Sequence, residues 1–271
     1  TQSLLLPCGR CVGCRLERSR QWSVRIMHEA KASDFNAFVT LTYRDEDLPP
    51  GGSLRYRDFQ LFMKRVRKWR GATRFFVCGE YGDRLGRPHF HAGLFGVCFA
   101  DRKRFKQTDS GSRLYVSDQL DALWPSGFAS VGDLTPESAA YMARYTFKKV
   151  TGRIADDHYR RVDQNTGEVY YVEPEFAHMS LKPGIGATWF AQYESDVYPH
   201  DRVVMRGKVG PPPRYYDQLL KRANPELLEQ VQQQRILNAV DKWPDHTPER
   251  LAVREEVTKA RVASFKRKLN K

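Results

Sequence analysis

Long apolar runs are absent from this chain of 271 residues. A membrane-spanning helix needs roughly 18 or more consecutive apolar residues, and no segment approaches that length. Leu4-Leu5-Leu6 is also too short for the apolar region of a secretory signal. We therefore expect a soluble protein that is not exported and that has no membrane partner.

Cysteine is scarce, and the number of cysteines is odd. An odd number in a chain of ordinary domain size argues against a disulfide framework and favours a reducing cytoplasm. The sequence also lacks a G-x-x-x-x-G-K-[ST] phosphate loop, which argues against a nucleotide cofactor. No repeat of a fixed period is visible. The cysteines are Cys8, Cys11, Cys14, Cys78 and Cys98.

Acidic residues are outnumbered, with 32 Asp and Glu against 45 Lys and Arg and a formal net charge of +13. Such an excess favours a polyanionic partner through counterion release and electrostatic steering. Charge alone does not distinguish DNA, RNA and anionic lipid. The content of 41% hydrophobic and 12% aromatic residues allows a buried core, either in one enzymatic domain with appendages or in two small domains.

The periodicity of apolar residues predicts an α+β fold. Alternation over 36–43 predicts a strand with Phe38, Thr40 and Thr42 on one face. Residues 74–80 and a segment beginning at Pro88 predict an antiparallel hairpin, because the residues between them favour a turn. A further strand is expected near 129–134. Helices are expected around residues 22–30, 59–66, 117–124, 135–149 and 248–271.

Basic residues crowd the outer face of the helix predicted around 59–66, where they are candidates for DNA contact. The helix predicted at 248–271 also ends in basic residues, and we favour a nucleic-acid contact there over an ordinary solvated face. The candidate DNA-binding residues are Arg65, Arg67, Lys68, Arg70, Arg87 and Arg144.

Three cysteines precede the first predicted helix in the order Cys8, Cys11 and Cys14. Their spacing is compatible with a structural Zn²⁺ ion, but such sites normally have four protein ligands, and no fourth follows nearby. Reduced thiols in a turn are the alternative interpretation. Both interpretations stay open at this point.

Two histidines lie two residues apart on the strand that begins at Pro88. Residues two apart point to the same side of a strand, so His89 and His91 can converge on one ion while Phe90 enters the opposite face. A pair of ordinary surface or core histidines is the alternative, because an H-x-H pattern arises often by chance. The pattern therefore depends on its neighbours for its meaning.

Glu80 provides such a neighbour, because it ends the preceding strand of the predicted hairpin. Two imidazoles and one carboxylate would leave coordination positions open, as a catalytic divalent ion requires. Mixed nitrogen and oxygen ligands accept Mn²⁺ or Mg²⁺. Without the histidines, Glu80 would be interpreted as a solvent-exposed hairpin carboxylate.

Two tyrosines lie four residues apart on the helix predicted at 135–149. This spacing puts the phenols of Tyr141 and Tyr145 on one helix face. Core packing is the usual explanation for such a pair, but Lys148 and Lys149 suit a phosphodiester backbone better than a dry core. A tyrosine hydroxyl has a reference pKa of about 10, so attack on phosphorus would need a metal ion or a lysine to share the developing charge.

Three segments together resemble the motifs of HUH endonucleases, and within them the replication initiators of microviruses of the gokushovirus branch. The later segments 182–186, 195–199 and 212–216 and the amino-terminal cysteines resemble the same group, so the resemblance covers most of the chain. The three segments are Phe38-Val-Thr-Leu-Thr-Tyr43, Arg87-Pro-His-Phe-His-Ala-Gly-Leu-Phe95 and Tyr141-Met-Ala-Arg-Tyr145-Thr-Phe-Lys-Lys149.

The resemblance implies a central antiparallel sheet of about five strands flanked by helices, with a basic helical carboxyl-terminal extension. It also implies an enzyme that cuts one strand of phage origin DNA, leaving a 5′-phosphotyrosine and a 3′-hydroxyl that primes rolling-circle replication, and then rejoins the displaced strand. Single-stranded origin DNA, a host helicase and the host replication machinery in the bacterial cytoplasm are the implied partners. By position, His89 and His91 match the metal motif, and Tyr141 and Tyr145 match the nucleophile motif.

We expect three regions: a cysteine-containing segment and helix at 1–35, the endonuclease domain at 36–200, and a proline-rich connector with basic helices at 201–271. Two other functions fit part of the pattern. A non-enzymatic binder of single-stranded nucleic acid would explain the charge but not the histidines. A metal-dependent nuclease that uses activated water would explain the histidines but not the tyrosines.

Overall fold

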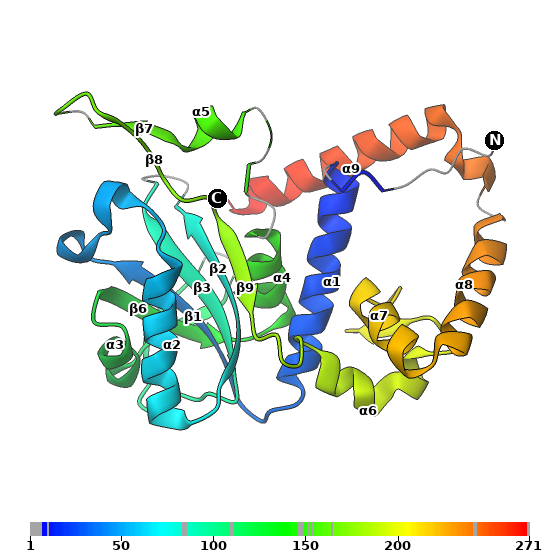
Figure 1. Cartoon of the computed structure of the whole chain (residues 1–271), viewed down its shortest axis with the longest axis horizontal. Coiled ribbons are helices and arrows are strands. Elements are labelled where there is room, and N and C mark those ends of the chain that lie inside the picture. The colour runs from blue at the N-terminus through cyan, green and yellow to red at the C-terminus, as the bar shows by residue number, and fades with distance from the viewer. Residues whose placement is uncertain are drawn as a thin grey trace.

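The computed structural model describes the backbone of most of the chain (Figure 1). At Tyr145, Trp243 and residues 264–269 the description covers the backbone alone. The residues outside the description are 1–6, 10, 83–85, 109–110, 146–148, 151, 153, 164, 241–242 and 270–271.

Within the described residues, seven strands form one antiparallel sheet in the order β4-β5-β6-β1-β3-β2-β9. The α+β class is therefore confirmed, with a sheet wider than the expected five strands. Two separate antiparallel pairs join β7 (Arg160–Val162) to β8 (Val169–Tyr171) and β10 (Val203–Met205) to β11 (Lys208–Gly210). The sheet strands are β1 (Asn36–Tyr43), β2 (Arg74–Tyr81), β3 (Pro88–Phe95), β4 (Lys103–Gln107), β5 (Arg113–Val116), β6 (Gly127–Asp133) and β9 (Phe176–Met179).

The central strands alternate as predicted. Along β1, every second side chain is buried, including Val39 and Leu41, which enter one face of the sheet. The intervening Phe38 and Thr40 point to the other face. The hairpin of β2 and β3 is confirmed, and its register pairs Glu80 with His89.

One face of the sheet is covered by α2 (Tyr56–Arg70) and α3 (Asp118–Leu123). The apolar stripe that predicted α2 is fully buried against the strands. It consists of Phe59, Phe62, Met63 and Val66.

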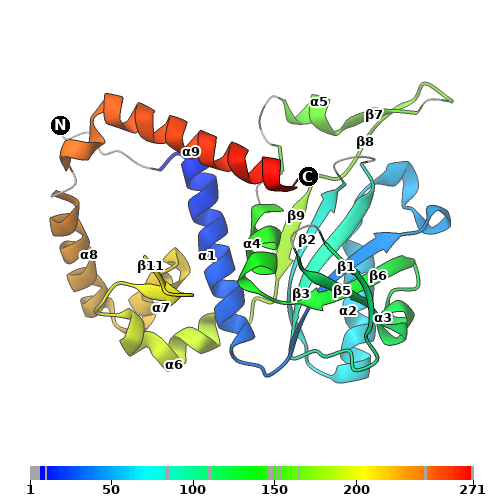
Figure 2. The same cartoon turned by 180° about the vertical axis from the view of Figure 1, so that it is seen from behind.

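The other face is covered by α4 (Pro136–Tyr145), with α1 (Val12–Ala30) packed against α4 (Figure 2). Ile26 of α1 and Met142 of α4 share a core with Phe76 of β2. The predicted N-cap of α4 is confirmed, because the Ser138 N–H donates to the Thr135 hydroxyl. The predicted extension of this helix to Lys149 passes through residues outside the description.

A second core lies on the far side of α1. There α6 (Ala187–Val197), α7 (Arg214–Ala223) and α8 (Pro225–Val240) enclose Phe190, Tyr216 and Leu228, and Val24 of α1 completes the cluster. The short α5 (Ala155–Tyr159) precedes β7. Helix α1 thus belongs to both halves of the molecule, as Figure 1 shows.

The last helix, α9 (Pro248–Leu269), confirms the helix predicted at the carboxyl end. In both views it runs from the side of α8 across the first part of α1, which it contacts, toward the sheet (Figures 1 and 2). No helix in the described ranges combines the length and apolarity needed to cross a membrane.

Candidate metal centre

The predicted metal ligands lie on neighbouring central strands and point to the face covered by α4. His89 and His91 share this face of β3, while Phe90 between them is buried in the opposite core. The strand register places Glu80 of β2 directly opposite His89. The structure therefore brings together the three residues that the sequence pattern selected.

One carboxylate oxygen joins the two imidazoles. Oε1 of Glu80 lies 2.9 Å from Nε2 of His89 and 2.9 Å from Nε2 of His91. The two imidazole rings are nearly perpendicular, with centroids 4.8 Å apart. All three candidate ligand atoms lie within 4.8 Å of one another, so a single ion can contact all three.

Burial gives this carboxylate a strong electrostatic requirement. The Glu80 side chain is only 2% exposed, and a buried charge needs a positive partner. Burial alone would raise the pKa of Glu80, but hydrogen bonds from His89 and His91 outweigh it and lower the pKa to about 2. Glu80 is therefore ionised across the physiological pH range.

The outer nitrogens of both imidazoles also have partners. Nδ1 of His89 lies 3.0 Å from the carbonyl oxygen of Arg87, which can only accept a hydrogen bond, so this nitrogen carries a proton. Nδ1 of His91 lies 2.9 Å from the hydroxyl of Thr40. Such outer contacts are typical of histidines that bind metal through Nε2.

The donor set fits a divalent cation. The His89 ring lies between two acceptors, the Arg87 carbonyl and the Glu80 carboxylate. Such a ring either carries both protons or turns one nitrogen to a cation. Two nitrogens and one carboxylate oxygen leave positions for a substrate oxygen and for water, and this mixture suits Mn²⁺ or Mg²⁺.

Tyr141 reaches this centre from α4. Its hydroxyl lies 3.4 Å from Nε2 of His91, and the two rings are close to perpendicular with centroids 5.0 Å apart. The exposed guanidinium of Arg144 lies 5.8 Å from the centre of the Tyr141 ring. A phenol, a cationic side chain and the candidate metal ligands therefore meet at one place on the sheet.

The other residues expected beside Tyr141 are described less fully. Tyr145 is the last residue of α4, and its side chain is not described. Lys148 lies outside the described residues, and Lys149 is exposed beyond them. The roles that the sequence suggests for these three residues stay predictions.

The basic residues of α2 lie apart from the metal centre, because α2 covers the opposite face of the sheet. Arg65 donates to the carbonyl of Leu123, and Arg67 donates to the carbonyl of Thr73. Lys68 and Arg70 at the end of the helix are exposed. Any DNA contact made by these residues is therefore separate from the chemistry at Tyr141.

Arg87 is engaged within the protein. Its guanidinium donates to the carbonyl of Tyr43 and to the carboxylate of Asp45, and so ties the end of β1 to the start of β3. Its backbone carbonyl is the partner of His89. The described contacts of Arg87 thus position the metal centre, and its proposed DNA contact stays a prediction.

Thr40 and Phe38 are parts of the site that the sequence pattern did not single out. Phe38 stacks on the His91 ring with a centroid distance of 5.6 Å, and Thr40 holds Nδ1 of the same ring. The signal was present in the alternation of β1, which put both residues on one face. Their relation to His91 also required the pairing of β1 with β3.

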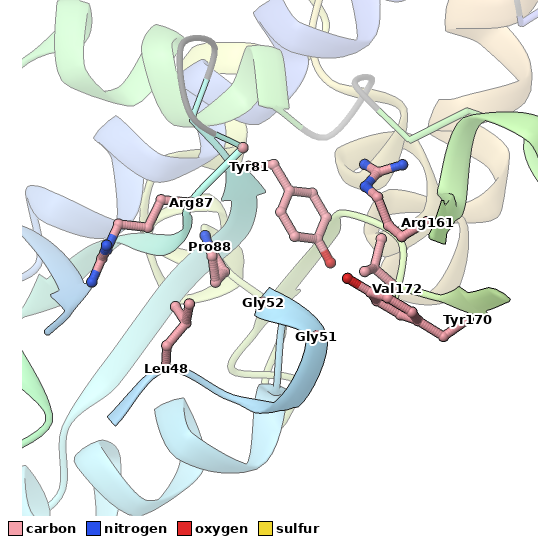
Figure 3. A pocket seen from close by; sticks show the side chains of 10 residues that line it. Leu48, Gly51, Gly52, Tyr81, Arg87, Pro88, Arg161, Tyr170 and Val172 are labelled. Carbon is pink, nitrogen blue, oxygen red and sulfur yellow. The ribbon is translucent and has the colours of Figure 1, made fainter. Parts of the chain in front are cut away.

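A pocket of about 260 Å³ opens at the same ends of β2 and β3 but on the other face (Figure 3). Figure 3 shows Tyr81 of β2 and Tyr170 of β8 with their hydroxyl groups directed toward each other. Arg161 of β7 lies beside them, and the Tyr170 ring packs on Gly51, where a Cβ atom would come within 2.6 Å. The sheet separates this pocket from the metal centre.

Comparisons with known proteins agree with the motif pattern. The family model for the replication-associated protein ORF2 matches residues 36–150, which span β1 to the end of α4 and so include the metal centre. No solved structure matches the chain at a significant level.

Curated relatives come from three bacterial viruses. Replication-associated protein VP4 of Bdellovibrio phage phiMH2K is 35% identical over 83% of this chain and 70% of its own length. Replication-associated protein ORF2 of Spiroplasma virus 4 is 32% identical over 80% and 68%, respectively. Replication-associated protein ORF4 of Chlamydia phage 1 is 28% identical over 81% and 54%. The resemblance seen in the motifs is confirmed, and the chain belongs to the family of phage replication-associated proteins.

Proposed function

We propose that this chain starts rolling-circle replication by nicking one strand of phage origin DNA with a tyrosine nucleophile. The observation that carries the proposal is the distance of 3.4 Å between the Tyr141 hydroxyl and Nε2 of His91. Core packing would not require a phenol to meet two imidazoles and a buried carboxylate. A nucleophile beside a metal centre does require this arrangement.

Glu80, His89 and His91 would hold the metal ion. When bound, a divalent ion supplies positive charge that polarises the scissile phosphate and offsets the charge developing on its oxygens. Thr40 and the carbonyl of Arg87 orient the imidazoles through their Nδ1 atoms. Arg144 adds a permanent positive charge on the open side of the Tyr141 ring.

The proposed reaction exchanges one phosphate ester for another. The Tyr141 oxygen attacks phosphorus as the phenol loses its proton, and the bond from phosphorus to the 3′ oxygen breaks. The 3′ oxygen takes up a proton and becomes the hydroxyl that primes synthesis. The 5′ phosphate stays on the tyrosine, so the energy of the ester bond is kept for rejoining the strand.

Tyr145 would act in a second cycle. It lies one helical turn beyond Tyr141 on α4, so both tyrosines start from the same helix face. One tyrosine could hold the 5′ end while the other cuts the regenerated origin and releases a circle. Because no phosphate loop occurs in the sequence, we assign strand separation to a host helicase.

A cleavage assay with labelled single-stranded origin DNA and Mn²⁺ tests this proposal. We expect a protein–DNA adduct that survives denaturant, that is absent from the double variant Tyr141→Phe/Tyr145→Phe, and that persists in the matched control Tyr193→Phe on α6. Cleavage by the wild-type protein without an adduct would indicate activated water as the nucleophile. Binding without cleavage would indicate a passive nucleic-acid-binding protein.

The metal centre is tested in the same assay. We expect His89→Ala and His91→Ala to abolish nicking while the fold and most of the DNA affinity are retained, because neither change removes basic surface. Circular dichroism and a binding titration provide these controls. Normal nicking by His89→Ala would show that this centre does not take part.

A further inference from the structure

A second group of metal-binding side chains lies outside the proposed nicking site. Cys8, Cys11 and Cys14 occupy the turn that leads into α1, and their three sulfur atoms lie within 4.8 Å of one another. All three cysteines are free thiols, and Cys8 and Cys11 are exposed. The two described clusters of candidate metal ligands are therefore chemically different, one rich in sulfur and the other made of imidazole and carboxylate.

The backbone of this turn is arranged around the sulfur atoms. The N–H of Cys11 donates to Sγ of Cys8 at 3.2 Å, and the N–H of Cys14 donates to Sγ of Cys11 at 3.5 Å. Hydrogen bonds that donate to sulfur favour its thiolate form, which is the form that binds metal. Two such turns in succession bring the sulfur atoms together without help from a distant part of the chain.

The surroundings can balance the charge of a thiolate complex. A divalent ion with three thiolates carries a net charge of −1, and the amino end of a helix favours negative charge. The first turn of α1 contains no acidic residue. Arg15 follows Cys14 directly, and the guanidinium of Arg18 lies close to Gly9, where it would be 3.7 Å from an added Cβ atom.

We propose that Cys8, Cys11 and Cys14 bind one zinc ion. A tetrahedral ion with Zn–S bonds of about 2.3 Å holds its sulfur atoms roughly 3.8 Å apart. The three sulfur atoms here need only a small contraction to reach that spacing. An iron–sulfur cubane requires a wider arrangement, because each of its cysteines binds a different iron atom. The closeness of the sulfurs therefore favours a single ion.

The fourth coordination position belongs to an exogenous ligand such as water. Among the described residues, no other cysteine, histidine or carboxylate joins this cluster. The ion would fix the turn against the first residues of α1, close to where α9 crosses this helix. Because α1 packs on α4, the bound ion supports the helix that carries Tyr141 without contacting the nicking site.

Metal analysis of the purified full-length chain tests the proposal. The variant His89→Ala/His91→Ala is used as the background, so that zinc at the other centre does not contribute. After dialysis against zinc and then against buffer, we expect about one equivalent of zinc per chain. Cys11→Ser in this background should retain less than about a tenth of that amount, because a tetrahedral site with two thiolates binds zinc far more weakly.

Cys98→Ser is the matched control and should keep the full amount of zinc, because Cys98 lies outside the cluster. Replacement of zinc by Co²⁺ adds a second readout, since thiolate ligands give charge-transfer absorption that Cys11→Ser should lose. Iron and acid-labile sulfide in place of zinc would overturn the proposal. It would also be overturned by a chain without zinc after reconstitution, or by equal zinc in the Cys11→Ser variant.

Discussion

The hydroxyl of Thr40 is the smallest part of the metal centre and the easiest to remove cleanly. It lies 2.9 Å from Nδ1 of His91 and fixes the direction in which Nε2 points. Removing an outer partner of this kind typically weakens metal binding about 10-fold to 100-fold. We expect Thr40→Val to weaken Mn²⁺ binding by about 10-fold or more, as measured by calorimetry.

Thr42→Val is the matched control for that measurement. Thr42 lies on the same face of β1, opposite His89, and the same change of shape is made there. Its described contacts include no hydrogen bond to an imidazole, so we expect Mn²⁺ affinity close to that of the wild type. Equal affinities of the Thr40 and Thr42 variants would remove the assigned role of Thr40.

Glu80 gives a prediction for stability in the presence of metal. A ligand at 100 times its dissociation constant stabilises a folded protein by about 2.7 kcal/mol. For a chain of this size, that corresponds to a rise of very roughly 5 to 10 °C in the melting temperature. We expect Mn²⁺ to raise the melting temperature of the wild type and to leave that of Glu80→Gln nearly unchanged. An equal rise in both proteins would place the ion elsewhere.

At the residue scale, the sequence predicted the metal ligands well because strand geometry is periodic. Alternation alone puts His89 and His91 on one face, and the hairpin brings Glu80 opposite them. The same periodicity did not show which strand lies on the other side of β3. The contacts of Thr40 with His91 depend on that long-range pairing and so became visible only in the folded chain.

Helix α1 connects the two halves of the molecule through a buried histidine. His28 is 3% exposed, its ring stacks on Trp189 at a centroid distance of 3.5 Å, and its Nδ1 lies 2.8 Å from the hydroxyl of Tyr216. Burial, with a smaller contribution from Lys31, lowers the pKa of His28 to about 3. The side chain is therefore neutral in the folded protein at physiological pH.

The sign of the resulting pH dependence follows from linkage. The unfolded chain has the ordinary histidine pKa of about 6.5, so below that pH it binds a proton that the folded chain does not bind. Stability is therefore lost as pH falls from about 6.5 toward 3. At pH 5 the loss due to His28 amounts to about 2 kcal/mol.

Thermal unfolding at pH 7 and pH 5 measures this effect. We expect the wild type to lose more stability between these two pH values than His28→Gln loses, because glutamine does not titrate. The exposed His200 provides the control, and His200→Gln should behave as the wild type does. A pH dependence in His28→Gln as large as that of the wild type would contradict the assignment.

At the element scale, strong patterns were predicted and weak ones were not. The long helices α2 and α9 and the central strands are evident from the periodicity of their residues. Strand β9 has four residues and joins the sheet about a hundred residues after β2, so only its pairing with β2 defines it. Strand β4 is exposed at the sheet edge and consists mainly of charged and polar residues, which gives it no apolar pattern.

The whole molecule carries its positive charge on several elements that lie far from one another. Helix α9 is rich in basic residues and crosses α1 toward the sheet (Figures 1 and 2). We propose that it contacts the DNA backbone outside the nicking site. The division of the chain at residues 35 and 200 likewise stays a proposal, and α1 packs against elements on both sides of the second boundary.

Truncation after Pro244 tests the role of α9. Removing one phosphate contact to a single strand reduces the slope of log affinity against log salt by about 0.7. We expect the truncated chain to have a flatter salt dependence of DNA binding. Because α9 also packs on α1, the full-length variant Lys259→Gln/Arg261→Gln serves as a second test that leaves the helix in place. An unchanged slope in both proteins would make α9 an ordinary solvated helix.

The central claim is that Glu80, His89, His91 and Tyr141 form one nicking site. The most direct test is mass spectrometry of the wild-type protein after reaction with single-stranded origin DNA and Mn²⁺, followed by nuclease and protease digestion. The account predicts a nucleotide 5′-phosphate attached to the α4 peptide at Tyr141, with a smaller fraction at Tyr145, and no such product after metal is removed with a chelator. Cleaved DNA with no nucleotide attached to either tyrosine would contradict it.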